Sequence, residues 1–211
     1  MIGNDTIYLM RHSEPFKIHR GIEDVNKSLL LSNKKSPLSI NGEKLAEEIS
    51  YKSEFNNLDV VWSSDYVRTM STAKYFAFNN NLKVNVSVKL GERIHGIQSW
   101  EELPVNFEIK QFEDENYKIG DGENQKEVKE RLIKFINKLL DEYKNKKILI
   151  VGHSTATAFL LKNWCEINYT GDYKFNNKTF FDGKWNYCET FKLEFDEDNN
   201  LKNINNIKFN F

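Results

Sequence analysis

The sequence predicts an α/β sandwich of three layers: a mostly parallel central sheet, helices on both faces and a C-terminal β-hairpin. Two observations favour this fold class. Short aliphatic runs alternate along the chain with segments in which apolar residues recur at helical spacing, as strand-helix units require. The final segment changes to a spacing of two residues, which is typical of paired antiparallel strands. The length of 211 residues suits a single domain over residues 1–211.

The first half of the chain contains two predicted strand-helix units. The apolar run at 6–10 predicts a buried strand that stops where charged residues begin. Residues 39–52 are expected to form a helix, because Ser39 is a favourable N-cap and apolar residues recur behind it. A second buried strand is expected at 59–62, and a helical pattern follows it at 67–78.

The second half repeats this alternation. Residues 83–88 alternate like a half-buried strand, and residues 128–140 carry the apolar stripe of a long helix. The run at 147–151 is aliphatic almost throughout and predicts another buried strand. Gly152 then lets the backbone turn sharply into a helix that is expected at 155–163.

The last part of the chain is expected to form a hairpin. Phe191, Leu193 and Phe195 alternate with charged residues, residues 196–200 supply a turn, and a second extended segment runs to Phe211. In mostly parallel sheets, ligands bind beyond the carboxyl ends of the strands. The predicted fold therefore indicates where a functional site should be sought.

Charge and composition exclude several classes of function. The 30 basic and 31 acidic residues leave a net charge of −1, so no global positive field would hold nucleic acid or an anionic membrane. The aliphatic run at 148–151 is far shorter than the roughly 20 residues that cross a bilayer, and the run at 7–10 is too short for a signal peptide. Cys165 and Cys188 lack metal-site spacing and fit a reducing compartment. We therefore expect a cytoplasmic protein without nucleic-acid or membrane partners, while the oligomeric state stays open.

Three predicted strands end in reactive or anion-binding residues. These are Arg11 and His12 after the first strand, Ser64 and Arg68 after the second, and His153 and Ser154 after the third. Two imidazoles and two guanidiniums at one sheet edge would suit a tetrahedral dianion, since arginine offers bidentate hydrogen bonds to phosphate. Neighbouring cations would also keep one imidazole neutral, and a neutral imidazole nitrogen is a competent nucleophile. A phosphoryl group is the expected ligand.

With these motifs the chain resembles the histidine phosphatase superfamily, the phosphoglycerate mutase-like enzymes. The segments that carry the resemblance are, in chain order, Arg11-His12-Ser13, Pro37-Leu38-Ser39 with Gly42, Ser63-Ser64 with Arg68 and Thr72-Ala73, Leu90-Gly91-Glu92-Arg93 with Gly96, Gly122-Glu123, and Val151-Gly152-His153. They span most of the chain in the family's order. Ser13 and Ser154 stand where the family most often has glycine.

The resemblance implies a role for each residue of the site. His12 would be the nucleophile that becomes phosphohistidine, and Glu92 would protonate the leaving oxygen and then deprotonate the attacking water. The phosphate oxygens would be held by Arg11, Arg68 and His153. The resemblance implies no cofactor, and the sequence contains no metal-binding motif.

Four further side chains are candidates for substrate binding: Ser13, Ser64, Ser154 and His19. The three serines have an alternative interpretation as turn or cap residues, and His19 has one as part of a solvated basic loop. Asp65 is a second candidate for the acid. His95 has two interpretations, as a residue that polarises Glu92 and as a solvent-facing loop histidine.

The expected function is hydrolysis of a small phosphate monoester, whose identity the sequence leaves open. One alternative is a phosphoglycerate mutase with the same nucleophile. Against it, Ile18 stands where the mutase branch commonly has asparagine, and the segment at 96–122 is short for a mutase. The other alternative is a non-catalytic phosphate-binding regulatory domain, which the intact set of polar residues disfavours.

Overall fold

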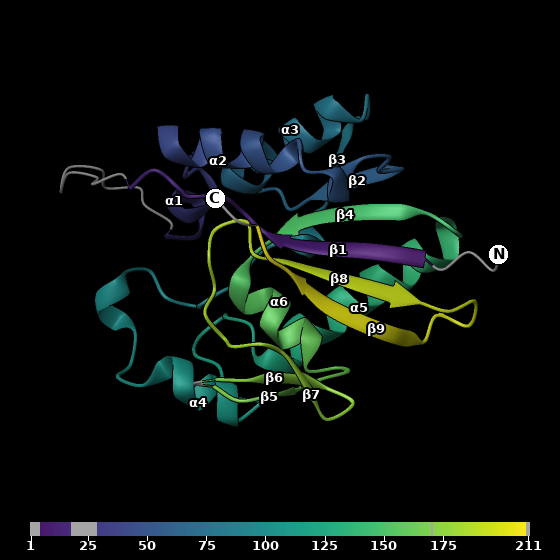
Figure 1. Ribbon diagram of the computed structural model, residues 1–211. Coiled ribbons are helices and arrows are strands. Elements are labelled where there is room, and N and C mark those ends of the chain that lie inside the picture. Colours follow the sequence, from purple (N-terminus) through teal and green to yellow (C-terminus); the bar gives the residue numbers. More distant parts are fainter. Residues whose placement is uncertain (1–4, 18–28, 170, 210–211) are drawn as a thin grey trace.

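The computed structural model describes residues 5–17, 29–169 and 171–209. In this part of the chain, six strands form the central sheet in the order β3-β2-β4-β1-β8-β9 (Figure 1). Their bounds are β1 (Asp5–Arg11), β2 (Val60–Ser63), β3 (Val84–Val86), β4 (Lys147–Gly152), β8 (Thr190–Phe195) and β9 (Leu201–Ile207). Strands β3, β2, β4 and β1 are parallel, whereas β8 pairs antiparallel with β1 and with β9. The predicted sheet and its C-terminal hairpin are confirmed.

Helices cover both faces of this sheet (Figure 1). The four helices that the sequence predicts correspond to α2 (Ile40–Ser50), α3 (Val67–Asn79), α5 (Gln125–Glu142) and α6 (Ser154–Leu161). Helices α2 and α3 lie on one face in Figure 1, and α5 and α6 lie on the other. The predicted three-layer α/β sandwich is therefore confirmed. Within the described ranges, no helix is both long and apolar enough to cross a membrane.

Burial on both faces explains why the central strands are aliphatic throughout. In β1, Tyr8 and Met10 pack into the core beside α2 and α3, whereas Ile7 and Leu9 pack into the core beside α5 and α6. The side chains of β4 at 148–151 divide between the two cores in the same way. Complete burial of one such side chain contributes about 1.5–3 kcal/mol to folding. The strand ends that carry the polar motifs are thus firmly positioned.

Capping residues set the helix starts. Ser39 accepts a hydrogen bond from Gly42 N–H at 2.9 Å, as its predicted N-cap role requires. Helix α5 begins at Gln125, three residues before its apolar stripe, because Asn124 and Glu127 form a reciprocal capping box. The predicted strand at 83–88 ends at Val86, since the Ser87 hydroxyl accepts from Lys89 N–H and starts a 3-10 turn.

Short elements were not predicted. They are α1 (Leu29–Lys34), α4 (Phe107–Glu113), the 3-10 turns Ser53–Phe55, Val88–Leu90 and Trp100–Glu102, and a small antiparallel sheet of β5 (Glu166–Ile167), β6 (Tyr173–Phe175) and β7 (Lys178–Phe181). Runs this short carry too little periodicity to identify them. Helix α4 and the small sheet lie at one end of the protein, beside α6 (Figure 1).

Candidate active site

The strand-end motifs meet because β4 lies between β2 and β1 in the sheet. The backbone N–H of His12 donates to Gly152 O at 3.0 Å, and that of Ser64 donates to Val151 O at 3.2 Å. These bonds extend the parallel pairing just past the ends of the strands. As a result, the ring centroids of His12 and His153 lie 5.4 Å apart.

His12 is buried, and its hydrogen bonding determines its tautomer. Nδ1 lies 2.7 Å from the Ser13 carbonyl oxygen, which can only accept, so Nδ1 carries the hydrogen. In the neutral ring, Nε2 then carries the free lone pair. Burial, with Arg68 and then Arg11 adding to it, lowers the pKa of His12 from 6.5 to about 3, although the bond to Ser13 opposes the shift. His12 is therefore neutral near pH 7.

His153 is bonded through both ring nitrogens. Its Nδ1 lies 3.3 Å from Arg68 Nη2, and because a guanidinium only donates, Nδ1 accepts. The hydrogen of the neutral ring is then on Nε2, which donates to Ser64 Oγ at 2.8 Å. Burial first, and then the nearby His12 and Arg68, hold the pKa of His153 well below 6.5. The Tyr66 ring packs against the imidazole, with 4.5 Å between the two ring centroids.

Arg68 is the second residue of α3, so its side chain projects from the helix start toward the strand ends. Its Nη1 donates to two oxygens of Asn33 on α1, the carbonyl at 2.6 Å and Oδ1 at 3.0 Å. Burial lowers the pKa of Arg68, while Glu92 counteracts the shift. The guanidinium is thus held between Asn33 and His153.

Arg11 is held by a loop from the C-terminal part of the chain. Its Nη1 donates to the carbonyl oxygens of Trp185 at 3.0 Å and Asn186 at 3.3 Å. Its Nε is buried and has no hydrogen-bond partner in the described part of the chain. The guanidinium lies 4.9 Å from the centre of the Tyr187 ring.

Glu92 reaches across to the start of α6, directly after His153. Its Oε1 accepts from Ala156 N–H at 2.7 Å and from Arg93 N–H at 3.0 Å. Its Oε2 accepts from Thr155 N–H at the longer distance of 3.3 Å. The helix start therefore fixes the carboxylate near Arg11 and Arg68, whose pKa values it raises against the effect of burial, and leaves Oε2 the less engaged oxygen.

The remaining candidates differ in their placement. The Ser13 hydroxyl donates to Gly42 O at 2.7 Å and so joins α2 to the loop after β1. The Asp65 carboxylate pairs with Lys34 at 2.6 Å, and His95 accepts from Arg93 Nη2 at 3.1 Å. Ser154 is partly exposed and lines a neighbouring cavity. His19 and Ile18 lie outside the described residues.

Several participants in the site were not found by sequence reasoning. Asn33, the carbonyls of Trp185 and Asn186, and the N–H groups of Thr155 and Ala156 hold the charged side chains in place. Backbone groups carry no residue-type signal, and Asn33 belongs to an unpredicted helix. Only the tertiary structure shows these partners.

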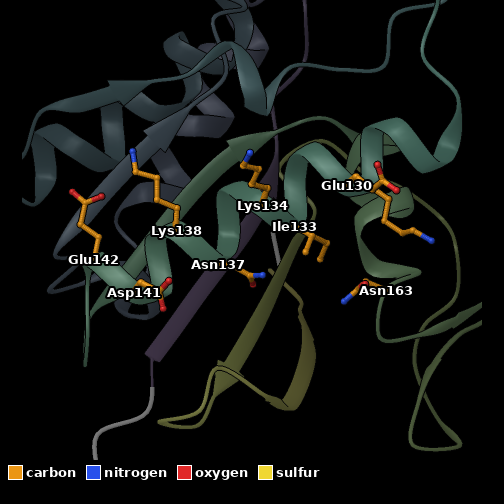
Figure 2. A pocket seen from close by; sticks show the side chains of 9 residues that line it. Glu130, Ile133, Lys134, Asn137, Lys138, Asp141, Glu142 and Asn163 are labelled. Carbon is orange, nitrogen blue, oxygen red and sulfur yellow. The ribbon is translucent and has the colours of Figure 1, made fainter.

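A cavity of about 510 Å³ adjoins Arg11, Ser154 and Thr155. A larger hollow of about 850 Å³ lies along α5 (Figure 2). Its lining comes from α5, apart from Asn163, and consists largely of charged side chains such as Lys134 and Glu142. In the part of the chain that the structure describes, this lining includes no strand-end motif residue. We therefore place the candidate active site at the edge of the sheet.

The low pKa of His12 predicts an NMR result. We expect the His12 ring signals to stay those of a neutral imidazole between pH 8 and pH 5, because folding lowers its pKa from 6.5 to about 3. Between those two pKa values the unfolded chain binds a proton that the folded protein does not, so His12 makes the folded state less stable as the pH falls through this window. Labelled histidine, assigned by comparison with His12→Asn, provides the measurement. A titration midpoint near 6.5 would contradict the prediction.

Fold and site together define an α/β protein with two imidazoles and two guanidiniums clustered at the carboxyl ends of parallel strands. His12, Arg68 and His153 are buried, and Arg11 is partly exposed. The chain belongs to the histidine phosphatase superfamily, since the model of branch 1 of that superfamily matches residues 7–206. The resemblance seen in the motifs is thereby confirmed.

Solved structures share this fold at low sequence identity. The structure called mycobacterial hydrolase 1 has a TM-score of 0.68 and 15% identity, with 99% of each chain covered. A mycobacterial glucosyl-3-phosphoglycerate phosphatase has a TM-score of 0.66 and 14% identity, with 90% of each chain covered. A mutant phosphoserine phosphatase from Entamoeba histolytica, in complex with phosphoserine, has a TM-score of 0.63 and 18% identity over 95% of this chain and 96% of that one. Comparison with curated proteins gives no match.

Proposed function

We propose that the protein hydrolyses a small phosphate monoester through a phosphohistidine intermediate on His12. The observation that carries this proposal is the state of His12, a buried neutral ring whose Nδ1–H donates to the Ser13 carbonyl. Its Nε2 carries the lone pair and makes no hydrogen bond within the described residues. Arg11 and Arg68 place positive charge close enough to the His12 ring to lower its pKa. Membership of the superfamily and the names of two similar structures, both phosphatases, also support the proposal.

In the proposed first step, Nε2 of His12 attacks phosphorus and the bond from phosphorus to the leaving oxygen breaks. A proton on Glu92 passes to that oxygen, which departs as an alcohol. We assign the proton to Oε2, because this oxygen has a single, longer bond to Thr155, whereas Oε1 accepts two N–H groups. In the second step, the Glu92 carboxylate takes a proton from water as the water oxygen attacks phosphorus. The bond from nitrogen to phosphorus breaks and its electron pair returns to Nε2.

The charged side chains would stabilise the phosphoryl oxygens in both steps. A buried donor without a partner costs about 1–3 kcal/mol, and a phosphate oxygen would satisfy Arg11 Nε in this way. Preorganised donors of this kind typically contribute about 10²- to 10³-fold to the rate. For His153 to donate to the phosphate, a phosphate oxygen must displace Ser64 from Nε2, because Nδ1 of the neutral ring is itself an acceptor.

The test is release of inorganic phosphate from 4-nitrophenyl phosphate and from a panel of phosphorylated metabolites, in the presence of a chelator. We expect turnover that competes with added phosphate or vanadate. Binding of vanadate without any turnover would favour a regulatory domain instead. Interconversion of 2- and 3-phosphoglycerate without net phosphate release would favour a mutase.

A further inference from the structure

The cavity beside the candidate site lies where a leaving group would have to be. Arg11, Ser154 and Thr155 are among the residues that line the cavity, and Arg11 is one of the side chains to which we assign the phosphate. The N–H of Thr155 binds Glu92 Oε2, the oxygen to which we assign the proton for the departing alcohol. A phosphoryl group on His12 would therefore direct the organic part of its ester into this cavity.

Five of the twelve residues that line the cavity are aromatic. They are Phe112 from α4, Phe159 from α6, Tyr173 from β6, and Tyr169 and Trp185 from the loops beside the small sheet. Phe159 and Tyr173 are buried, whereas Tyr169 is 46% exposed and packs edge-on against Phe112 at 5.3 Å. Aromatic walls of this kind pack against flat apolar ring faces.

The charges in the cavity disfavour an acidic leaving group. Besides Arg11, the charged residues among its described lining are Arg93 and Glu108. Arg93 is 4% exposed, and its guanidinium donates to Gln111, to His95 and to both oxygens of Glu108. Its charge is thus already balanced by Glu108, whose side chain remains 45% exposed. Apart from Arg11, which we assign to the phosphoryl group, a carboxylate or second phosphate on the substrate would meet the Glu108 carboxylate and an arginine that is already paired with it.

From these contacts we infer that the cavity selects phosphate esters of uncharged, ring-bearing alcohols. The ring packs against Tyr169 and the neighbouring aromatic walls, and its hydroxyl groups, where present, donate to Glu108. The inference rests on the proposed phosphoryl transfer at His12 and names the substrate class for that reaction. Phosphoglycerates, which carry a carboxylate, are poor substrates on this basis.

Four esters with alkoxide leaving groups test the inference: benzyl phosphate, glucose 6-phosphate, ethyl phosphate and 3-phosphoglycerate. We expect kcat/KM to be higher for the two ring esters than for the other two, and the two ring esters distinguish an aromatic ring from a sugar ring.

Tyr169→Ala should lower kcat/KM about two- to tenfold for the ring esters and leave that of ethyl phosphate unchanged. Tyr51→Ala, at a tyrosine that is 65% exposed on another part of the surface, is the matched control and should change nothing. Glu108→Gln should raise kcat/KM for 3-phosphoglycerate about two- to fivefold relative to ethyl phosphate.

Binding of benzylphosphonate and methylphosphonate, measured by calorimetry, separates this inference from the proposed function. One outcome is that no ester is hydrolysed, that benzylphosphonate binds more tightly than methylphosphonate, and that Tyr169→Ala removes this difference. In that case the proposed function fails and the ring-binding cavity stands. The inference is overturned if 3-phosphoglycerate is the best of the four substrates, if Tyr169→Ala affects all esters equally, or if the two phosphonates bind equally.

Discussion

Replacement of His12 by asparagine is expected to lower kcat/KM by more than about 10³-fold and to abolish the phosphoenzyme, because the amide side chain has no nucleophilic nitrogen in place of Nε2. Asparagine is the useful substitution, since its amide nitrogen can still donate to the Ser13 carbonyl and keep the loop after β1 in place. The measurement is initial-rate kinetics together with trapping of phosphoryl label on the protein from a radiolabelled ester.

The thermal unfolding midpoint serves as the control for this variant and should change little. Arg11→Ala or Arg68→Ala offers a graded comparison, with an expected loss of about 10²- to 10³-fold while the phosphoenzyme still forms. Turnover by His12→Asn at the wild-type rate, or label retained on the variant, would remove the basis of the proposed mechanism.

The second large effect concerns Glu92. With ethyl phosphate, we expect Glu92→Gln to lower kcat/KM about 10²- to 10⁴-fold, as loss of a positioned general acid does. With 4-nitrophenyl phosphate the loss in the first step should be much smaller, because 4-nitrophenolate departs without a proton. Glutamine keeps an oxygen that can accept from Ala156 N–H, so the start of α6 should remain fixed.

The difference between the two esters decides between two roles for Glu92. A residue that only anchors the helix start would, when replaced, reduce kcat/KM, which reports the first step, by the same factor for both esters and would lower the unfolding midpoint. A general acid would show the selective loss and an unchanged midpoint. Equal losses for both esters would therefore assign Glu92 a structural role and leave Asp65, now paired with Lys34, as the acid to test.

Local patterns were sufficient for the central fold. Strands β1 and β4 are continuous aliphatic runs because both of their faces are buried, and such runs are visible in the sequence alone. Helix α2 begins next to Ser39, whose side chain signals the cap directly. In contrast, β5 has two residues and β6 has three, so pairing partners brought by the fold, and not local propensity, create them.

The candidate site likewise has some features that local sequence patterns predict and others that depend on tertiary contacts. Parallel strands, together with the rule that ligands bind at their carboxyl ends, predicted that Arg11, His12 and His153 share one sheet edge. No sequence pattern predicted that Asn33 would hold Arg68, or that carbonyl groups more than 170 residues away would hold Arg11. These partners come from segments whose position depends on packing.

The sequence by itself determined the alternation of strands and helices, the order of the strand-end motifs and the residue types that can bind and transfer a phosphoryl group, because each is encoded in a few neighbouring residues. The tertiary structure decided the rest. It determined that His12 is buried with its lone pair on Nε2, that Glu92 lies against the start of α6, and that an aromatic cavity with a neutralised arginine adjoins them. These properties depend on burial and on distances between segments far apart in the chain, and no local pattern specifies either.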